Sequence, residues 1–237
     1  MPQQGPLRWL DGEGWVVLLG GGDWRHGETD QVDAQLLSVA NLDRPMVVLT
    51  AEGPRAEAEE ILDHYTLLGG PGGEAFSLVE LTRMQLETTR FLTLIQEAGI
   101  LYLGGEHVLS LVNNLHNSQA LRYIVEGYST YQGLTLIGAG AGAAALGHWA
   151  FTAQPPHQQA MGLGFVIGAV VVPHFRGTEH SPILRALPQI GEALLGLGIP
   201  DGTALALGPQ GQVETWGQET ITAVVSAGKN ATNDIDD

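Results

Sequence analysis

Short apolar runs alternate with amphipathic segments in the part of the chain before residue 140. Each run is short enough for a buried strand, and the runs cover residues 15–19, 45–50, 76–81, 100–103 and 134–137. Apolar positions recur at helical spacing between them, over residues 30–39, 55–68, 86–97 and 108–125. Continuous apolar strands separated by helices favour a mostly parallel central sheet covered by helices on both faces. The predicted fold class is therefore α/β.

The pattern changes after Phe151. β-like runs then cover residues 165–172, 204–207, 213–215 and 221–225, with one helix expected over about 181–195. Because short glycine-containing turns separate the last runs, we expect antiparallel pairing there. The sequence thus predicts one domain over residues 1–225, with a β-rich antiparallel C-terminal part. Residues 226–237 are polar and end in acids, and we expect them to form a disordered acidic tail.

Charge and composition narrow the range of partners. The chain has 10 Lys and Arg against 26 Asp and Glu, a formal net charge of -16 that repels nucleic acid and anionic lipid. The absence of cysteine excludes disulfides, a cysteine nucleophile and thiolate metal ligands. The sequence shows neither a signal peptide nor an apolar run long enough to span a membrane. We therefore expect a cytoplasmic protein that binds neither nucleic acid nor membrane.

The most informative segment is LTLIGAGAGAAALG at residues 134–147, where a strand leads into a turn of glycine and alanine. One interpretation is a dinucleotide-binding turn, since Gly138, Gly140 and Ala143 fit the spacing G-x-G-x-x-A. That turn also requires an acid about 20 residues later for the ribose, and there is no Asp or Glu between Ala143 and Thr178. The segment also follows the fifth predicted strand rather than the first.

A second interpretation is a nucleophile elbow of the form G-x-S-x-G. In such an elbow the central side chain stands above the sheet beside backbone N–H groups that bind an oxyanion. The small flanking residues are present here, but the centre is Gly140. A tight strand–helix turn without any chemistry explains the segment equally well on its own.

Five glycine-containing segments occur in the order found in the peptidase E (aspartyl dipeptidase) and cyanophycinase family, which the chain resembles from about residue 15 to 225. The segments are VVLLGGGD (16–23), ILYLGGEH (100–107), LIGAGAGA (136–143), GLGFVIGAVVVPHF (162–175) and GIPDGTALALG (198–208). The resemblance implies a class I glutamine-amidotransferase-like fold and a serine in a G-x-S-A-G-A elbow.

Residue by residue, the resemblance places the family's serine at Gly140 and its catalytic histidine at His174. The family's oxyanion loop matches Gly104-Gly105-Glu106, so backbone donors are expected at Gly105 and Ala141. The family's acid usually follows the elbow, and we find none in that region.

Loops after other strands are expected to complete the same pocket. Glu106 and His107 follow one strand, and Gly21, Gly22 and Asp23 follow the first.

Because glycine has no atom that attacks a carbonyl, we expect little or no serine-peptidase activity. The chain is predicted to be a pseudoenzyme without a cofactor, and a homodimer, that binds a small peptide-like ligand or a protein partner. One alternative is a hydrolase of altered mechanism, with a metal held by Glu106, His107 and His174. Another is NAD- or FAD-type dinucleotide binding at the loop of residues 138–143.

Overall fold

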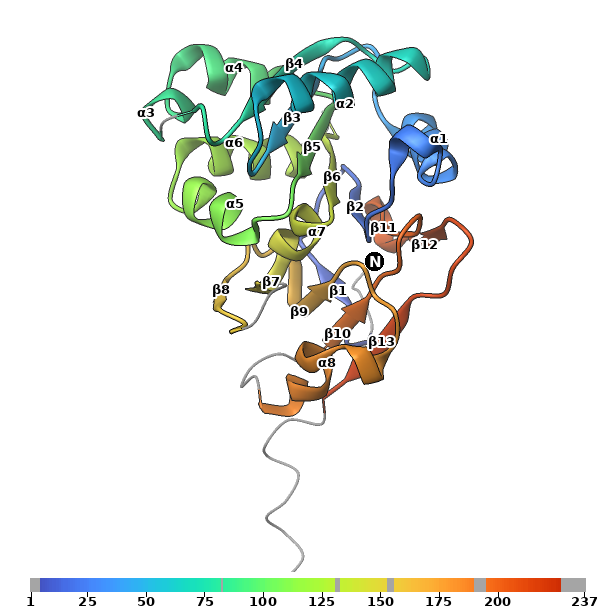
Figure 1. Ribbon diagram of the computed structural model, residues 1–237. Coiled ribbons are helices and arrows are strands. Elements are labelled where there is room, and N and C mark those ends of the chain that lie inside the picture. The colour runs from blue at the N-terminus through green and yellow to red at the C-terminus, as the bar shows by residue number, and fades with distance from the viewer. Residues whose placement is uncertain (1–4, 82, 131–132, 153–155, 190–194, 227–237) are drawn as a thin grey trace, which may run out of the picture.

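A computed structural model describes residues 5–81, 83–130, 133–152, 156–189 and 195–226 (Figure 1). Its strands form two sheets. The first sheet has the order β12 (Val213–Trp216), β11 (Ala204–Leu207), β2 (Val16–Leu19), β6 (Thr135–Ala139), β5 (Ile100–Gly104), β3 (Met46–Thr50) and β4 (Gly73–Ser77). The five strands β2, β6, β5, β3 and β4 are parallel to one another. β11 is antiparallel to both of its neighbours, β2 and β12. The parallel α/β prediction is confirmed for this sheet.

The second sheet contains the middle and end of the chain together with a short N-terminal strand. Its order is β13 (Thr222–Val225), β10 (Leu195–Gly198), β9 (Val166–Val172), β7 (Gly147–Phe151) and β8 (Gln159–Met161), with β1 (Arg8–Trp9) pairing to β9. β9 is parallel to β7 and to β10, and the outer pairs are antiparallel.

Successive residues of the first sheet's strands belong to different hydrophobic cores. Val47 and Leu49 of β3 pack into one core, and Val48 packs into the other. Side chains alternate between the faces of a sheet, so strands buried on both faces are apolar at every position. This explains why β3 is a continuous apolar run.

Helices cover both faces of the first sheet (Figure 1). One face carries α1 (Asp30–Val39) and α2 (Arg55–Leu67). The other carries α3 (Arg83–Leu86), α4 (Thr89–Glu97), α5 (Val108–Leu115) and α6 (Gln119–Ser129). The short α7 (Ala141–Leu146) lies between the two sheets and contacts strands of both. The last α-helix, α8 (Pro182–Ala186), covers the outer side of the second sheet.

Several details differ from the sequence predictions, and the strand expected over residues 76–81 is β4, which ends at Ser77. The helix expected over residues 108–125 is two helices, because Asn117 has a positive φ of 55° and the Ser118 side chain caps α6. The helix expected over about 181–195 is α8 followed by a short 3₁₀ turn, and Leu195 begins β10. The run at residues 221–225 pairs with β10 in the second sheet, so its expected pairing with 213–215 is wrong. The pairing of β11 with β12 is antiparallel as predicted.

The single domain over residues 1–225 stays a prediction. Of the predicted tail, residues 227–237 lie outside the described residues, and Ser226 is buried. No helix within the described residues has the length and hydrophobicity needed to cross a membrane.

Candidate functional site

Gly140 is the turn residue between β6 and α7. Its φ of 55° and ψ of -116° lie in a region that residues with a side chain rarely adopt. The turn is fixed by two hydrogen bonds, from the Gly140 N–H to the carbonyl oxygen of Leu19 (3.1 Å) and from the Ala144 N–H to that of Gly140 (3.2 Å). The backbone thus has the sharp strand–helix geometry expected of an elbow.

Two acceptor atoms face the missing side chain of Gly140. A Cβ built there would lie 3.4 Å from Nε2 of His174 and 3.4 Å from the carbonyl oxygen of Gly105. Apart from the chain neighbours and the backbone of α7 itself, no other atom of the described residues comes within 4 Å of that position. The site therefore has room for a small side chain directed at the imidazole.

His174 is oriented by an acid and by the backbone. It follows β9 with a φ of 52°, and its N–H donates to the carbonyl oxygen of Gly20 at 2.8 Å. Its Nδ1 lies 2.6 Å from Oδ1 of Asp201. Since an ionised carboxylate only accepts hydrogen bonds, Nδ1 of a neutral imidazole carries the hydrogen and Nε2 keeps its lone pair. That lone pair is directed to the Gly140 side.

The sequence prediction that the site has no acid is wrong, because Asp201 lies beside His174. It lies just after β10, in the segment of residues 198–208. The prediction failed because the acid was sought after the elbow along the chain, whereas β10 pairs with β9 and brings Asp201 to His174 through the sheet.

The glycine loop after β2 packs against His174 and Asp201 on the side away from Gly140. A Cβ on Gly21 would collide with the His174 ring, and Gly21 has a φ of 130° that disfavours any side chain. The N–H of Gly202, next to Asp201, donates to the carbonyl oxygen of Gly21 at 2.8 Å. Gly22 lies against Gly202, with 3.0 Å from its Cβ position to the Gly202 nitrogen. Gly21 and Gly22 therefore pack behind His174 and Asp201, but neither is among the residues that line the pocket beside His174, and their predicted role as pocket residues stays a prediction.

Asp23 is engaged elsewhere. Its Oδ1 accepts from the Arg25 N–H at 3.0 Å, and its Oδ2 lies 2.7 Å from Nδ1 of His26. The hydrogen bond from His26 lowers the pKa of the exposed Asp23 carboxyl. Asp23 caps a surface turn and does not line the pocket beside His174, so its predicted role as a pocket residue is not supported.

The expected oxyanion donor at Ala141 is already occupied. Its N–H donates to the carbonyl oxygen of Gly105 at 3.0 Å. On the other side of the same loop, the N–H groups of Glu106 and His107 donate to the carboxylate of Glu52, the latter at 3.0 Å. The peptide after Gly105 thus presents its oxygen to the elbow and its N–H to Glu52. This is a correction of the sequence prediction, because an oxyanion needs donors at this place.

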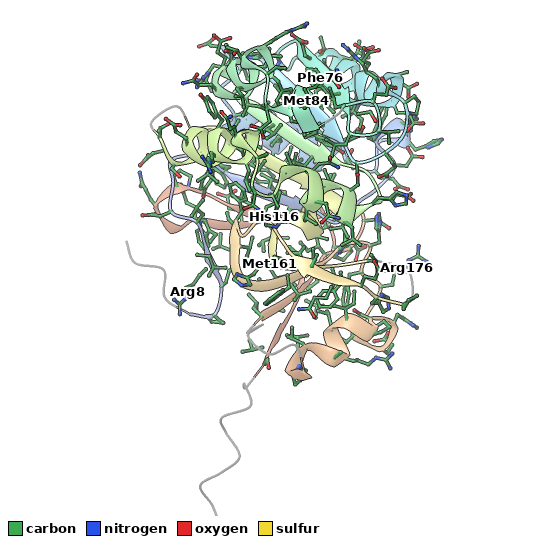
Figure 2. All side chains as sticks on the ribbon, turned by 90° about the vertical axis from the view of Figure 1, so that its left-hand side faces the viewer. Arg8, Phe76, Met84, His116, Met161 and Arg176 are labelled. Atoms are coloured by element: carbon green, nitrogen blue, oxygen red, sulfur yellow. The ribbon has the colours of Figure 1, made fainter. Side chains whose placement is uncertain are left out.

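A pocket of about 770 Å³ opens beside the pair. Ala141, Glu106, His107 and His174 line it together with loops of the second sheet. Its remaining wall includes apolar side chains, among them Phe151 and Ile183, and the basic side chains of His157, Arg176 and His180. Figure 2 shows Arg176 on the side of the molecule where α8 lies. A pocket of this size with a mixed apolar and polar lining suits a small molecule or a short peptide.

The metal alternative lacks a preformed site. Glu106, His107 and His174 all line the pocket, yet no group of three or more His, Asp or Glu side chains within the described ranges is placed to hold a metal ion. His174 also directs Nδ1 to Asp201.

The structure gives no support to the dinucleotide alternative, because the first N–H of α7 is already hydrogen-bonded. The Gly105 carbonyl covers the first N–H of α7, and all residues of that helix are buried. A pyrophosphate needs free N–H groups at a helix N-terminus.

Three residues of the site were not found from the sequence: Asp201, Glu52 and Arg176. Asp201 lies in the segment of residues 198–208, and the only sign of its role in the sequence is that it follows an apolar run. Glu52 follows β3, at the same sheet edge as the glycine loops, but nothing in its sequence spacing links it to Gly105.

Comparisons with known proteins agree with this fold. The model of peptidase family S51 matches residues 16–212. A peptidase from an acI-B1 Actinobacterium has a similar crystal structure, with a TM-score of 0.69 and 19% identity over 92% of this chain and 97% of that one. A candidate peptidase E protein from Listeria monocytogenes EGD-e superposes with a TM-score of 0.61 and 16% identity, over 87% and 99%. No curated protein matches the chain.

Proposed function

This chain belongs to peptidase family S51, and we propose that it is a binding protein of that family with little or no serine-peptidase activity. One observation carries the proposal: Gly140 faces Nε2 of His174 at the place where a serine hydroxyl would have to lie. In a serine peptidase the histidine takes a proton from that hydroxyl while its oxygen attacks the carbonyl. Here the base and its acid partner remain, and the attacking atom is absent.

The occupied amide of Ala141 supports the same conclusion. Peptide hydrolysis passes through an oxyanion that must be stabilised by N–H donors, and loss of one donor costs about 10²–10³ in kcat. At this site the carbonyl oxygen of Gly105 accepts a hydrogen bond from the Ala141 N–H. The partial negative charge of that oxygen lies next to Gly140. Water activated by His174 would therefore meet an unfavourable field at the transition state.

Binding requires only the pocket, which remains open next to these residues. Its volume of about 770 Å³ and its mixture of apolar and basic wall suit a small peptide-like ligand. A protein partner that inserts one side chain is a second occupant consistent with this shape. A cytoplasmic location and a homodimeric state complete the proposal, and light scattering on the purified chain tests the latter.

Labelling with a fluorophosphonate probe tests the function directly. The probe phosphonylates an activated serine, and we expect no labelling of the wild-type chain because Gly140 offers no hydroxyl. Turnover of a dipeptide library measured alongside should equal the rate without protein. Labelling of the native fold, or hydrolysis at an ordinary enzyme rate of about 1–10³ s⁻¹, would falsify the proposal.

A further inference from the structure

The second sheet carries a small hydrophobic cluster that the chain covers only in part. Val170 of β9 is buried in it, together with Leu187 of the 3₁₀ turn after α8. Phe151, Val172 and Ile183 pack against these two residues, but their side chains are only partly buried. The cluster is therefore open on the side of these three residues.

The open side of the cluster faces the pocket. Phe151 is the last residue of β7 and Val172 is the last residue of β9. Because Trp149 pairs with Val170 in parallel strands, the residues two positions later lie on the same face of the sheet. Ile183 comes from α8, and it lines the pocket together with Phe151 and Val172. We call these three pocket-lining side chains the apolar end.

Polar groups beside the apolar end are hydrogen-bonded within the protein. Nδ1 of His157 donates to the carbonyl oxygen of Thr152 at 2.7 Å, and the Gln158 N–H donates to Oγ1 of Thr152 at 2.8 Å. Oγ of Ser181 accepts from the Leu184 N–H at 3.2 Å. Since these groups already have partners in the chain, the surface that the apolar end offers to a ligand is hydrocarbon.

Arg176 places a permanent positive charge on the wall of the same pocket. Its side chain is exposed and forms no ion pair with the described residues, although the chain has 26 Asp and Glu. A guanidinium binds a carboxylate through two parallel hydrogen bonds. Glu106 is the one acidic side chain among the described residues that line the pocket. The wall thus combines hydrocarbon with an unpaired cation.

We propose that the apolar end binds the aromatic or branched aliphatic group of a small carboxylic acid, whose carboxylate lies at Arg176. Burial of the hydrocarbon group provides most of the affinity, about fourfold for each buried CH₂, and Arg176 orients the ligand. The pocket volume of about 770 Å³ accommodates a molecule of this kind. The inference rests on the proposed binding function and adds to it the chemical class of the ligand.

A series of phenylalkanoates tests the inference on the full chain. It runs from phenylacetate to 5-phenylpentanoate, so that one member matches the separation of the apolar end and Arg176. NMR titration gives the dissociation constants. We expect the best member to bind at least about tenfold more tightly than the alkanoate that lacks the ring, because the ring buries several carbon atoms. Equal affinity of the two compounds overturns the inference.

The alcohol that corresponds to the best phenylalkanoate tests the carboxylate. It keeps the ring and the chain length but has no negative charge. We expect it to bind about threefold or more weakly than the acid, the effect of one exposed ion pair. An alcohol that binds as tightly as the acid contradicts the placement of a carboxylate at Arg176.

Ile183→Ala locates the hydrocarbon group. It removes part of the apolar end, so binding of the best phenylalkanoate should weaken by about fivefold or more. The affinity for the alkanoate without the ring should not change. Ile167→Ala is the matched control, because Ile167 is an isoleucine of β9 that is 42% exposed and does not line the pocket. Equal effects of the two substitutions contradict the assignment.

Arg176→Gln locates the carboxylate. The substitution should abolish the preference for the acid over the alcohol and leave the affinity for the alcohol unchanged. Arg185→Gln is the matched control, since Arg185 is an exposed arginine of α8 that does not line the pocket. A preference for the acid that persists in Arg176→Gln shows that the carboxylate binds elsewhere.

The outcomes separate this inference from the proposed function. If the wild-type chain is not labelled by fluorophosphonate and the ring gives no gain in affinity, only the inference about the ligand fails. If the chain is labelled or hydrolyses peptides, the proposed function fails. Should Ile183→Ala not fold, as judged by circular dichroism, the ligand series on the wild-type chain still decides.

Discussion

Nε2 of His174 lies 3.4 Å from the place where a Cβ of Gly140 would stand, and Nδ1 of the same ring lies 2.6 Å from the carboxylate of Asp201. A hydroxyl on that Cβ would come within hydrogen-bonding reach of the imidazole. The chain therefore keeps the base, its orienting acid and the backbone turn in the arrangement that activates a serine.

Gly140→Ser should consequently create a reactive serine. We expect fluorophosphonate labelling of this variant, because His174 accepts the hydroxyl proton and Asp201 stabilises the resulting imidazolium. The side chain at a φ of 55° and ψ of -116° should lower the free energy of unfolding by about 1–3 kcal/mol. Labelling is followed by mass spectrometry, and unfolding by urea denaturation.

The control for this variant is Asp201→Asn in the Gly140→Ser background. It leaves the shape of the side chain intact, and it should slow labelling by orders of magnitude because the imidazole loses its orienting carboxylate. A folded Gly140→Ser chain that remains unlabelled would mean that the two residues are not placed as described here.

Glu52 should limit the turnover of the Gly140→Ser variant. Its carboxylate accepts the N–H groups of Glu106 and His107, which keeps the Gly105 carbonyl on the Ala141 amide. Glu52→Ala removes this restraint and lets the loop present an N–H to the elbow. In the serine background we expect ester hydrolysis to rise by about tenfold or more, within the 10²–10³ that one oxyanion donor contributes. Steady-state hydrolysis of p-nitrophenyl acetate measures the change.

Glu57→Ala is the matched control, since Glu57 is an exposed glutamate on α2 in the same part of the chain. It should leave ester hydrolysis unchanged. If Glu52→Ala also leaves it unchanged, Glu52 does not determine the orientation of the loop.

Gly21→Ala should destabilise the protein and displace His174. Its Cβ would collide with the imidazole, and a φ of 130° adds backbone strain. Strain and overpacking together should lower the free energy of unfolding by about 2–5 kcal/mol. In a Gly140→Ser background the substitution should also abolish fluorophosphonate labelling.

Gly164→Ala separates strain from collision. Gly164 has a φ of 78°, and its Cβ would meet no described atom within 4 Å. We expect a loss of about 1–2 kcal/mol from backbone strain alone. An equal loss for both variants would show that Gly21 is not packed against His174.

Asp33 holds a buried network between α1 and α2. Its carboxylate is 1% exposed and accepts from Thr29 Oγ1 at 2.7 Å and from the Tyr65 hydroxyl at 2.6 Å, with His64 Nε2 at 2.9 Å. Burial and the nearby Asp33 charge raise the pKa of Tyr65 well above its usual range, so this hydroxyl keeps its proton and donates. Asp33→Ala should lower the free energy of unfolding by about 3–5 kcal/mol.

Asp63→Ala, at an exposed position on α2, should change the free energy of unfolding by no more than about 0.5 kcal/mol. Denaturant unfolding of the two variants under the same conditions makes the comparison. A loss below about 1 kcal/mol for Asp33→Ala would contradict a structural role for the network.

The strands of the first sheet could be predicted from the sequence because the relevant signal is local. β3 and β5 are buried on both faces, so both are continuously apolar up to Leu49 and Leu103, and Gly104 ends β5. Gly140 and His174 were assigned to one site through the resemblance of short motifs to the peptidase E family, and the structure brings the two residues close together. The apolar runs and the motifs depend only on neighbouring residues along the chain.

Other features depend on contacts between segments that are distant in the sequence. β10 and β13 form a second sheet with β9, and nothing in their apolar pattern distinguishes this partner from β12. Asp201 reaches His174 across 27 positions because β9 and β10 are hydrogen-bonded neighbours. Strand pairing therefore decided which acid orients the histidine.

The orientation of the peptide after Gly105 likewise depends on contacts between segments that are distant in the sequence. The sequence by itself determined that a flexible glycine stands there and that Gly140 has no side chain. Only the tertiary structure decided that the Gly105 carbonyl turns toward Gly140, since this follows from the Ala141 amide on one side and the Glu52 carboxylate on the other. A glycine permits either orientation at little cost, so the partners that surround it in space select one.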